Sequence, residues 1–370
     1  MRPVPGPPRG LRLRAGLRLV RRGDDEVQVG TDPRWATRLT GLTPHEVRAL
    51  VALPPDANLS DLAHDERIDP ARLASLVDGL DAADLLDRGT SRAPAAPGAA
   101  DARALGLVRA DGRGTEVVAT RGRRTVGVHG LDRTGLGVAV LLATAGVGSL
   151  VLEDDGAVRS CDVGSGYGWA QVGTLRASAA ARVVADAVPT ARIGSPVTGL
   201  DPDVVVLCVA GAVDSGRAAA LVSAGVPHLC VVAGDVELSV GPLVVPGRGP
   251  CTRCLDLHRA QVDPAWPTVA AALAQPHRVP PATAAAACTA AAACAAALVL
   301  AHLDAIGTRD RPADDAPAYQ VGLDGLARER RWAAHPACGC AALSADQAAG
   351  FLRGRPRPRF IGTTSPETKT

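Results

Sequence analysis

Apolar and polar residues alternate over residues 16–30, GLRLVRRGDDEVQVG, on both sides of Gly23, Asp24 and Asp25. A period of two places the apolar side chains on one face of a strand, and a cluster of glycine and aspartate favours a tight turn. The pattern therefore predicts a β-hairpin near the start of the chain.

The hydrophobic period then changes to that of a helix. Residues 43–46, TPHE, have the signature of a capping box and predict a helix that ends near Leu53. A second helix is expected over residues 59–66, and a third, behind an Asp-Pro cap, over residues 71–80. A hairpin with three short helices predicts a winged-helix-like module over residues 16–90.

The charge of this module argues against a DNA partner. Residues 16–90 contain fourteen acidic residues and nine arginines, with no lysine. A surface that binds duplex DNA needs an excess of positive charge. The module is therefore expected to bind a peptide or to serve a structural role.

Beyond a proline- and alanine-rich linker at residues 91–103, apolar strands alternate with helices. The predicted elements are strand 125–129, helix 136–145, strand 149–153, strand 203–209, helix 215–224 and strand 227–232. The first three form one βαβ unit. The second domain, residues 104–345, is therefore expected to be α/β and Rossmann-like, with a mainly parallel sheet.

Composition fits a soluble protein of the cytoplasm without nucleic-acid affinity. The 370 residues are 47% hydrophobic and have a net charge of +2. Residues 282–301 are uncharged and long enough to cross a bilayer, but they are mostly alanine, which favours a buried helix over a membrane span. Residues 1–15 lack the apolar run of a secretory signal, and both they and residues 346–370 are expected to be disordered.

Two tight cysteine pairs, Cys251-x-x-Cys254 and Cys338-x-Cys340, predict one tetrahedral metal site. Zinc is the expected ion, and four sulfur ligands leave no open position, so the site would be structural. Disulfides or separate buried thiols would give the same count, and His258 is a fallback ligand. The other cysteines are expected mostly in the core: Cys161, Cys208, Cys230, Cys288 and Cys294.

A glycine-containing turn at residues 130–135, GLDRTG, joins the first strand of the βαβ unit to its helix. Such turns cradle phosphates when small residues let the backbone amides approach the anion. Asp132 stands where the second glycine is needed and adds a negative charge, which Arg133 partly offsets. Asp154 ends the next strand, about twenty residues on, within the usual reach of a ribose.

Taken in order, these features resemble the ThiF/MoeB/HesA family, the ubiquitin-activating-enzyme-like adenylating fold, across residues 120–343. The resemblance is carried by the loop and helix with AGVG at 145–148, Asp154, the turn VGTLR at 172–176, the strand 203–208 and the cysteine pairs. It implies a fold in which ATP and magnesium serve to adenylate the C-terminal glycine of a small carrier protein.

Carried over residue by residue, the family's charged groups are largely missing. Its Asn-x-x-Arg-Gln stretch falls on Asp162, Ser165 and Gly166, its lysine on Arg176, and its magnesium-binding aspartate on Ala210. The loss of the family's phosphate-contacting arginine and of its magnesium-binding aspartate removes the electrostatic stabilisation that nucleotidyl transfer needs. The resemblance leaves no catalytic residue, and its nucleotide contacts reduce to Gly130, Asp132, Arg133, Gly135, Asp154 and Arg176.

The combination also resembles the leader-peptide-binding partners of azole-forming (TOMM) cyclodehydratases, whose ending is similar to residues 335–340, HPACGC. In that group a winged-helix-like RiPP recognition element binds a precursor's leader peptide as an added strand. The resemblance implies such a surface at the edge around residues 26–29 and at the helix 71–80. It also implies a homodimer and a separate YcaO-type partner enzyme.

The leading hypothesis is a non-catalytic, zinc-containing scaffold that binds a leader peptide or small carrier protein and presents it to a partner enzyme. The alternative is a divergent ATP-dependent adenylyltransferase that uses Arg176 and Asp154. A nicotinamide-dependent dehydrogenase would rest only on the βαβ unit and the pair Glu153-Asp154. Thiol catalysis by Cys288 or Cys294 is disfavoured, because apolar neighbours raise the pKa of a thiol.

Overall fold

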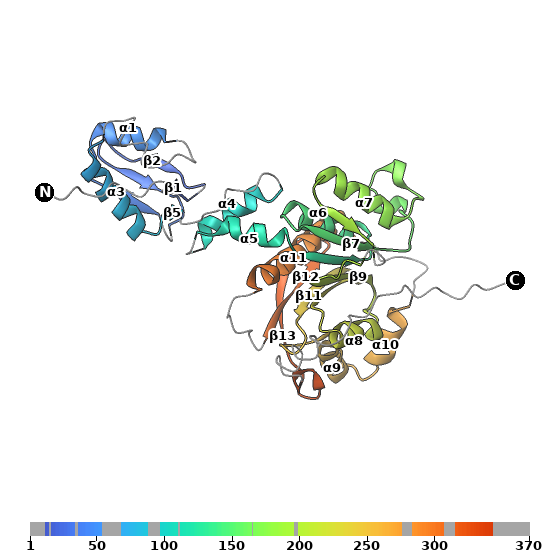
Figure 1. Cartoon of the computed structure of the whole chain (residues 1–370). Coiled ribbons are helices and arrows are strands. Elements are labelled where there is room, and N and C mark those ends of the chain that lie inside the picture. The colour runs from blue at the N-terminus through green and yellow to red at the C-terminus, as the bar shows by residue number, and fades with distance from the viewer. Residues whose placement is uncertain are drawn as a thin grey trace. The chain divides into compact units, whose positions relative to one another are not determined.

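The computed structural model divides the chain into two compact units, Met1–Thr120 and Arg121–Thr370 (Figure 1). The boundary thus lies at Thr120 rather than at the expected residue 104. The described residues are 12–14, 16–33, 36–53, 68–87, 97–109, 112–164, 166–195, 199–275, 283–306 and 315–342. The expected helix 59–66, Ser165 and the tail 346–370 lie outside them.

The first unit contains two small antiparallel sheets. Their strands are β1 (Arg12–Leu13), β2 (Leu19–Arg21), β3 (Val27–Val29), β4 (Thr37–Leu39) and β5 (Leu86–Asp87). The predicted hairpin is confirmed as β2 and β3, which pair through Leu19 and Val29. Because β4 also pairs with β3, the expected edge at residues 26–29 is wrong: β3 is the central strand, and β2 and β4 are the edges. β1, which pairs with β5, lies in the stretch expected to be disordered.

Two helices of the first unit begin where the sequence signals place them. α1 (Pro44–Ala52) has the full capping box, in which the Glu46 amide donates to Thr43 Oγ1 (3.2 Å) and the Thr43 amide donates to Glu46 Oε2 (2.7 Å). α3 (Pro70–Ala82) starts behind the Asp69 cap. The expected linker ends earlier than residue 103, because α4 (Ala99–Val108) begins inside it, and α5 (Gly114–Arg121) was also not foreseen.

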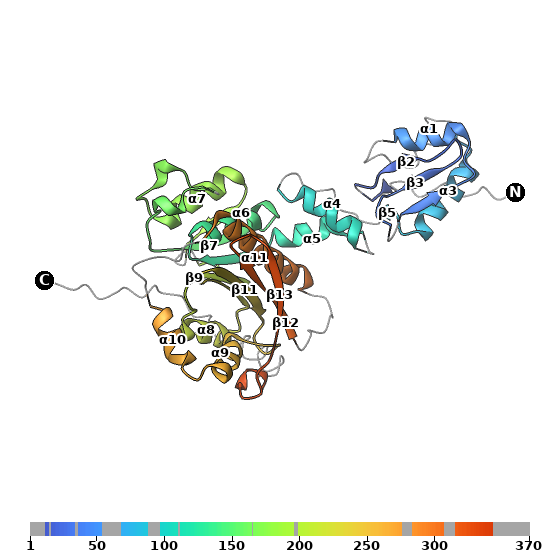
Figure 2. The same ribbon diagram turned by 180° about the vertical axis from the view of Figure 1, so that it is seen from behind.

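An eight-stranded sheet forms the centre of the second unit (Figure 2). Its strands are β6 (Thr125–His129), β7 (Ser149–Glu153), β8 (Arg192–Gly194), β9 (Val204–Ala210), β10 (His228–Ala233), β11 (Glu237–Val244), β12 (Asp315–Gly322) and β13 (Ala327–Ala333). The order is β13-β12-β11-β10-β9-β6-β7-β8, and β10, β9, β6, β7 and β8 are parallel. The predicted mainly parallel α/β sheet is confirmed, with three antiparallel strands added at one side.

Helices cover both faces of this sheet. Along β9, Val204 and Val206 belong to the large core cluster, while Val205 and Leu207 belong to a smaller cluster on the opposite face. The large cluster contains residues of α6 (Arg133–Thr144), α7 (Arg176–Ala187) and α11 (Ala285–Ala305), and the smaller contains one residue of α8 (Ser215–Ser223). α9 (Thr252–Val262) and α10 (Trp266–Leu273) follow β11 in the chain.

α11 is the alanine-rich segment whose length would allow a membrane span. By length and composition it is the one described helix that qualifies. Ala287, Ala291, Ala295 and Val299 recur at helical spacing and are fully buried in the core beneath the sheet. A core helix, as expected from the sequence, explains this apolar run.

Candidate functional site

The glycine turn lies at the carboxyl end of β6, between β6 and α6. Gly130 has a φ of 75°, and a Cβ there would lie 2.0 Å from the carbonyl oxygen of Cys208 at β9. A Cβ on Gly135 would lie 1.8 Å from the Gly130 carbonyl oxygen. Both positions need glycine because the turn is pressed against its neighbours. This is the edge of a doubly wound sheet at which ligands usually bind.

Asp132 is the N-cap of α6. Its Oδ1 accepts hydrogen bonds from the amides of Thr134 (2.9 Å) and Gly135 (3.1 Å). Burial raises the pKa of Asp132, although the Gly135 amide and the nearby Arg176 act in the opposite direction. The carboxylate thus takes the amides that a helix N-terminus would offer to an external anion.

Asp154 holds the turn from the other side. Its Oδ2 accepts a hydrogen bond from the Leu131 amide (2.6 Å), and its Oδ1 accepts one from the Gly156 amide (2.7 Å). The side chain is mostly buried. In this arrangement the acid expected to contact a ribose fastens the turn to the end of β7.

Arg176, the first residue of α7, is bound to two carboxylates. Its Nη2 and Nε lie 2.6 Å and 3.0 Å from Asp162 Oδ2, and its Nη1 lies 3.5 Å from Asp154 Oδ2. Burial alone would lower the pKa of Arg176, but the bond to Asp162 and the charge of Asp154 raise it. Asp162 itself is buried. Sequence reasoning counted Arg176 among the expected nucleotide contacts but missed Asp162 as its partner.

Two further hydrogen bonds connect the turn and the start of α6 to the segment that follows β7. The Tyr167 hydroxyl donates to the Leu131 carbonyl (2.8 Å), and burial followed by the charge of Asp154 raises its pKa. The Arg133 Nη2 donates to the Val163 carbonyl (2.8 Å). Arg133 therefore points to the main chain after β7. Ala210, on which the resemblance places the family's magnesium-binding aspartate, ends β9.

A second polar group lies beside the turn, at the carboxyl ends of β6 and β7. Glu153 Oε2 lies 3.1 Å from His129 Nε2, and Glu153 Oε1 lies 3.3 Å from Arg217 Nη2 of α8. Burial and the charges of Asp155 and Asp154 raise the pKa of Glu153 to about 7. The proximity of Arg217 favours the opposite shift, since this arginine stays charged near neutral pH even though partial burial lowers its pKa to about 10.

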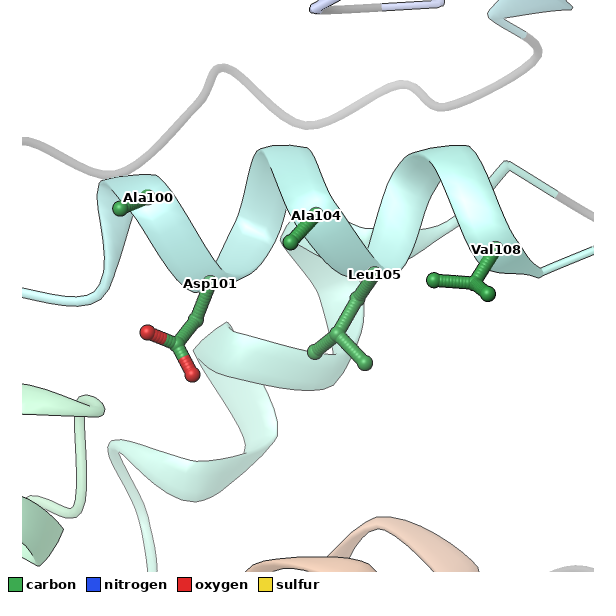
Figure 3. A pocket seen from close by; sticks show the side chains of 5 residues that line it. All are labelled: Ala100, Asp101, Ala104, Leu105 and Val108. Carbon is green, nitrogen blue, oxygen red and sulfur yellow. The ribbon is translucent and has the colours of Figure 1, made fainter. Parts of the chain in front are cut away.

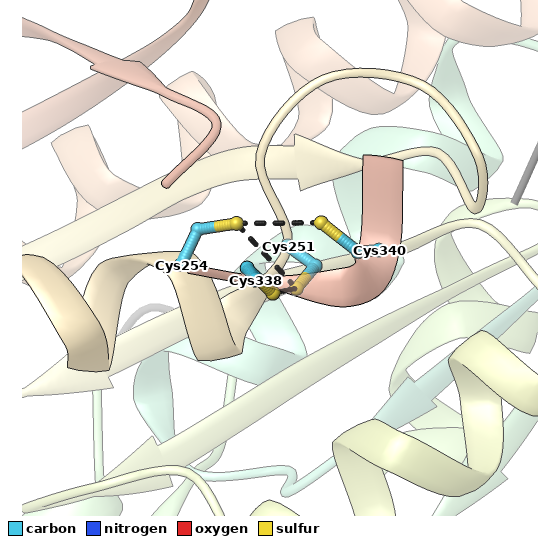
Figure 4. Close-up of side chains that lie close together, drawn as sticks. All are labelled: Cys251, Cys254, Cys338 and Cys340. Carbon is cyan, nitrogen blue, oxygen red and sulfur yellow. Dashed lines mark hydrogen bonds between the residues drawn. The ribbon is translucent and has the colours of Figure 1, made fainter. Parts of the chain in front are cut away.

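The four paired cysteines converge on one point (Figure 4). The sulfur of Cys251 lies 3.8 Å from that of Cys254 and 3.7 Å from that of Cys338, and the sulfurs of Cys254 and Cys340 are 3.4 Å apart. Bonds of about 2.3 Å to a tetrahedral ion place sulfurs about 3.8 Å apart. All nine cysteines are free thiols, so the disulfide alternative is wrong.

The surroundings of the cluster fit a buried, closed site. Cys251 is the N-cap of α9, Cys254 lies in its first turn, and the other pair follows β13. Trp332 and Val244 pack in the same apolar cluster. His258 Nε2 instead lies 3.1 Å from the Ala333 carbonyl, so the fallback ligand is not part of the group. The cluster can hold a metal ion with four sulfur ligands.

The remaining cysteines follow the expectation with one exception. Cys208, Cys230 and Cys288 are buried and Cys294 is half-buried, but Cys161 is exposed next to Asp162.

A shallow hollow also lies along α4, lined by Ala100, Asp101, Ala104, Leu105 and Val108 (Figure 3). Its lining is largely apolar and contains no basic side chain, so it does not suit a nucleotide.

The chain has the fold of the ThiF/MoeB-like adenylating enzymes, as the sequence predicted. E. coli MccB crystallised with ATP superposes with a TM-score of 0.59 over 89% of this chain and 99% of that chain, at 15% identity. The microcin C7 biosynthetic enzyme MccB in complex with N-formylated MccA gives a TM-score of 0.57 over 90% and 99%, at 14% identity. PaaA gives 0.58 over 86% and 98%, at 15% identity. No family model and no curated protein matches the sequence.

Proposed function

We propose that this protein is a non-catalytic scaffold of the adenylating fold, which binds a precursor leader peptide or small carrier protein and presents it to a partner enzyme. The observation that carries the proposal is the set of internal bonds at the glycine turn. The amides of Leu131, Thr134 and Gly135 donate to carboxylates of the chain itself, and so does Arg176. These are the donors that would otherwise receive phosphates.

Charge supports the same conclusion. Asp132 places an acid at the N-terminus of α6, where a triphosphate, itself strongly negative, would approach, and Asp162 occupies the guanidinium of Arg176. Like charges in a partly desolvated site repel strongly. With Ala210 at the position of the metal-binding aspartate, the proposal assigns the turn a structural role in place of nucleotide chemistry.

A peptide partner is supported by the fold and by the first unit. MccB has been crystallised with the peptide MccA. Among the described residues, β2 and β4 are the edge strands of the three-stranded sheet, and a leader peptide adding to one of them would gain main-chain hydrogen bonds. We assign the first unit as a winged-helix-like recognition element on this basis.

Isothermal titration with leader peptides encoded beside the gene tests the proposal. Binding is expected to the full chain, and Mg-ATP is expected to give no heat. A matched pair of variants tests the reason: Asp132→Gly, which frees two amides, is expected to gain affinity for ATP, whereas Asp235→Gly, at an exposed turn, is not. Failure of every leader peptide to bind would remove the peptide role.

The retained fold, Arg176 and Asp154 favour one second candidate, a divergent adenylyltransferase that activates the C-terminus of a ubiquitin-like carrier. ATP–pyrophosphate exchange that depends on magnesium and a carrier protein would establish it and exclude the scaffold.

In either case we assign zinc to the four cysteines, and a YcaO-type enzyme as the partner of the scaffold. A cytoplasmic homodimer is part of the same proposal, and the exposed side chains of Trp169 and Leu175 suit a contact between copies.

A further inference from the structure

β13 is the last strand of the large sheet and pairs with β12 alone among the described residues (Figure 2). Residues 327–331 are all exposed, so the side chains on both faces of this part of the strand reach solvent. An uncovered edge strand offers main-chain donors and acceptors to an added strand. This edge lies in the second unit and is separate from the glycine turn and from the sheets of the first unit.

The strand carries an excess of positive charge. Its sequence, ARERRWA, contains three arginines and one glutamate. Two arginines have partners nearby: Arg328 lies 3.4 Å from Asp324, and Arg331 lies 2.9 Å from Glu329. Arg330 has no carboxylate within ion-pair distance among the described residues.

Stacking fixes Arg330 instead. Its guanidinium lies 4.2 Å from the ring centre of Trp332, and the guanidinium of Arg259 lies 5.8 Å from the same ring. Arg259 also lies 4.9 Å from the ring of Trp266, whose indole donates to Asp256 (2.9 Å). A guanidinium that stacks face-on keeps its N–H groups at the rim, where they can bind a carboxylate in bidentate fashion. Stacking therefore orders Arg330 without using its donors.

Charges on an edge strand also discourage pairing with other strands. Charge alone is enough for that protection, but Arg330, which has no ion pair among the described residues, is in addition stacked on the indole of Trp332. A second copy of β13 does not fit as the occupant, because each strand would bring three arginines against one glutamate. Acidic side chains at alternate positions of an extended chain would meet the arginines.

From this geometry we propose that the outer edge of β13 is a docking site for an extended acidic segment of a partner protein. The segment would pair with the main chain of β13, and one of its carboxylates would bind the rim of Arg330. The proposal does not depend on the leader-peptide role of the first unit. It adds a second contact, through which a scaffold can hold another protein.

The register identifies a main-chain group that tests strand pairing. The Gly322 amide donates to the Leu326 carbonyl (3.2 Å), so the main chain of Leu326 faces β12. Main-chain N–H and C=O groups point alternately toward and away from the neighbour along an antiparallel strand. The main-chain groups of Arg328 and Arg330 therefore also face β12, and the Glu329 amide faces away. Proline is tolerated at outward positions of edge strands. Glu329→Pro should therefore keep the fold but remove a donor from the docking edge.

The experiment measures fluorescence anisotropy of a labelled peptide of alternating threonine and glutamate, as long as the seven residues of β13. It is expected to bind the full chain more tightly than its threonine–lysine counterpart. Arg330→Glu should weaken binding about tenfold or more. Arg182→Glu, the same charge change at an exposed site on α7, should leave it unchanged. Thermal melting confirms that each variant is folded.

Glu329→Pro and Glu329→Gln separate strand pairing from charge alone. Both remove one acid and so make the edge more basic, but only the proline removes the outward amide. Loss of binding in Glu329→Pro and its retention in Glu329→Gln are the expected results. Equal binding by these two variants, equal binding by Arg330→Glu and Arg182→Glu, no preference for the acidic peptide, or tighter Arg330-dependent binding of a single-stranded oligothymidine would each overturn the proposal.

Discussion

Each carboxylate around the glycine turn is held by donors from a different part of the chain. Asp132 is bound by amides of its own helix, Asp154 by the amides of Leu131 and Gly156, and Asp162 by Arg176. Asp132 and Asp154 were evident as residues of interest from the sequence. Asp162 was noted only as a replacement for a family residue, because nothing local links it to Arg176, fourteen residues away.

Glu153 provides a prediction at this scale. Its pKa rises from 4.5 in the unfolded chain to about 7 in the fold. The folded protein then binds more protons between these values, so stability falls as pH rises through about 7. The glutamine of the Glu153→Gln variant cannot ionise. The free energy of unfolding of this variant, relative to that of the natural chain, should therefore be about 1–3 kcal/mol more favourable to folding at about pH 8 than at about pH 5.

Urea unfolding at both pH values measures this difference. Asp186→Asn, a change at an exposed acid on α7, serves as the control and should show no such pH dependence. If the two variants behave alike, Arg217 and His129 compensate the burial of Glu153, and its pKa is ordinary.

Among the elements, one buried arginine links two helices of the second unit. Arg121, the first residue of that unit, makes a bidentate pair with Asp304 of α11 through its Nε (2.8 Å) and Nη2 (2.6 Å). Its Nη1 donates to the Ala145 carbonyl at the end of α6 (3.1 Å). The side chain of Arg121 is only 4% exposed. A buried charge is tolerated here because its partner and a helix end satisfy it.

Removing this arginine should be costly. Arg121→Met leaves Asp304 buried without its counter-charge and should lower the free energy of unfolding by about 3–5 kcal/mol. The double change Arg121→Met with Asp304→Leu should recover much of this loss, because no isolated charge remains. Denaturant unfolding of the three chains forms the test, and a loss under about 1 kcal/mol for the single change would show that Asp304 is solvated.

For the molecule as a whole, the cysteine cluster joins segments far apart in the sequence. Cys251 and Cys338 are 87 residues apart, and the ion they are expected to share closes a loop that contains α9, α10, α11, β12 and β13. Closing a long loop removes many unfolded conformations, and metal binding adds to folding free energy. The four-cysteine cluster therefore joins the segment after β13, the last strand of the sheet, to the start of α9.

We expect the purified chain to contain one zinc ion. Cys338→Ser should abolish it and lower the melting temperature, and a chelator should do the same to the natural chain. Cys161→Ser, at an exposed thiol outside the cluster, should retain the metal and melt normally. Elemental analysis and thermal melting measure both effects. A metal-free natural chain, or equal melting of the two variants, would contradict the assignment.

The sequence predicted local elements well and their neighbours less well. β6 and β7 were placed to the residue, because a glycine turn and an apolar run define each boundary. α4 and α5 were missed, since a proline- and alanine-rich composition conceals the start of α4 at Ala99. The expected edge at residues 26–29 was wrong because β4, only three residues long, has too short a pattern to detect.

By itself the sequence determined what depends on spacing along the chain: the βαβ unit, the helix caps and the two cysteine pairs. Periodicity and capping act within a few residues, so they can be read without a fold. Only the tertiary structure decided which carboxylate binds Arg176 and which arginine stacks on Trp332. Those pairings depend on how strands and loops meet in space, and burial strengthens the bond between Arg176 and Asp162.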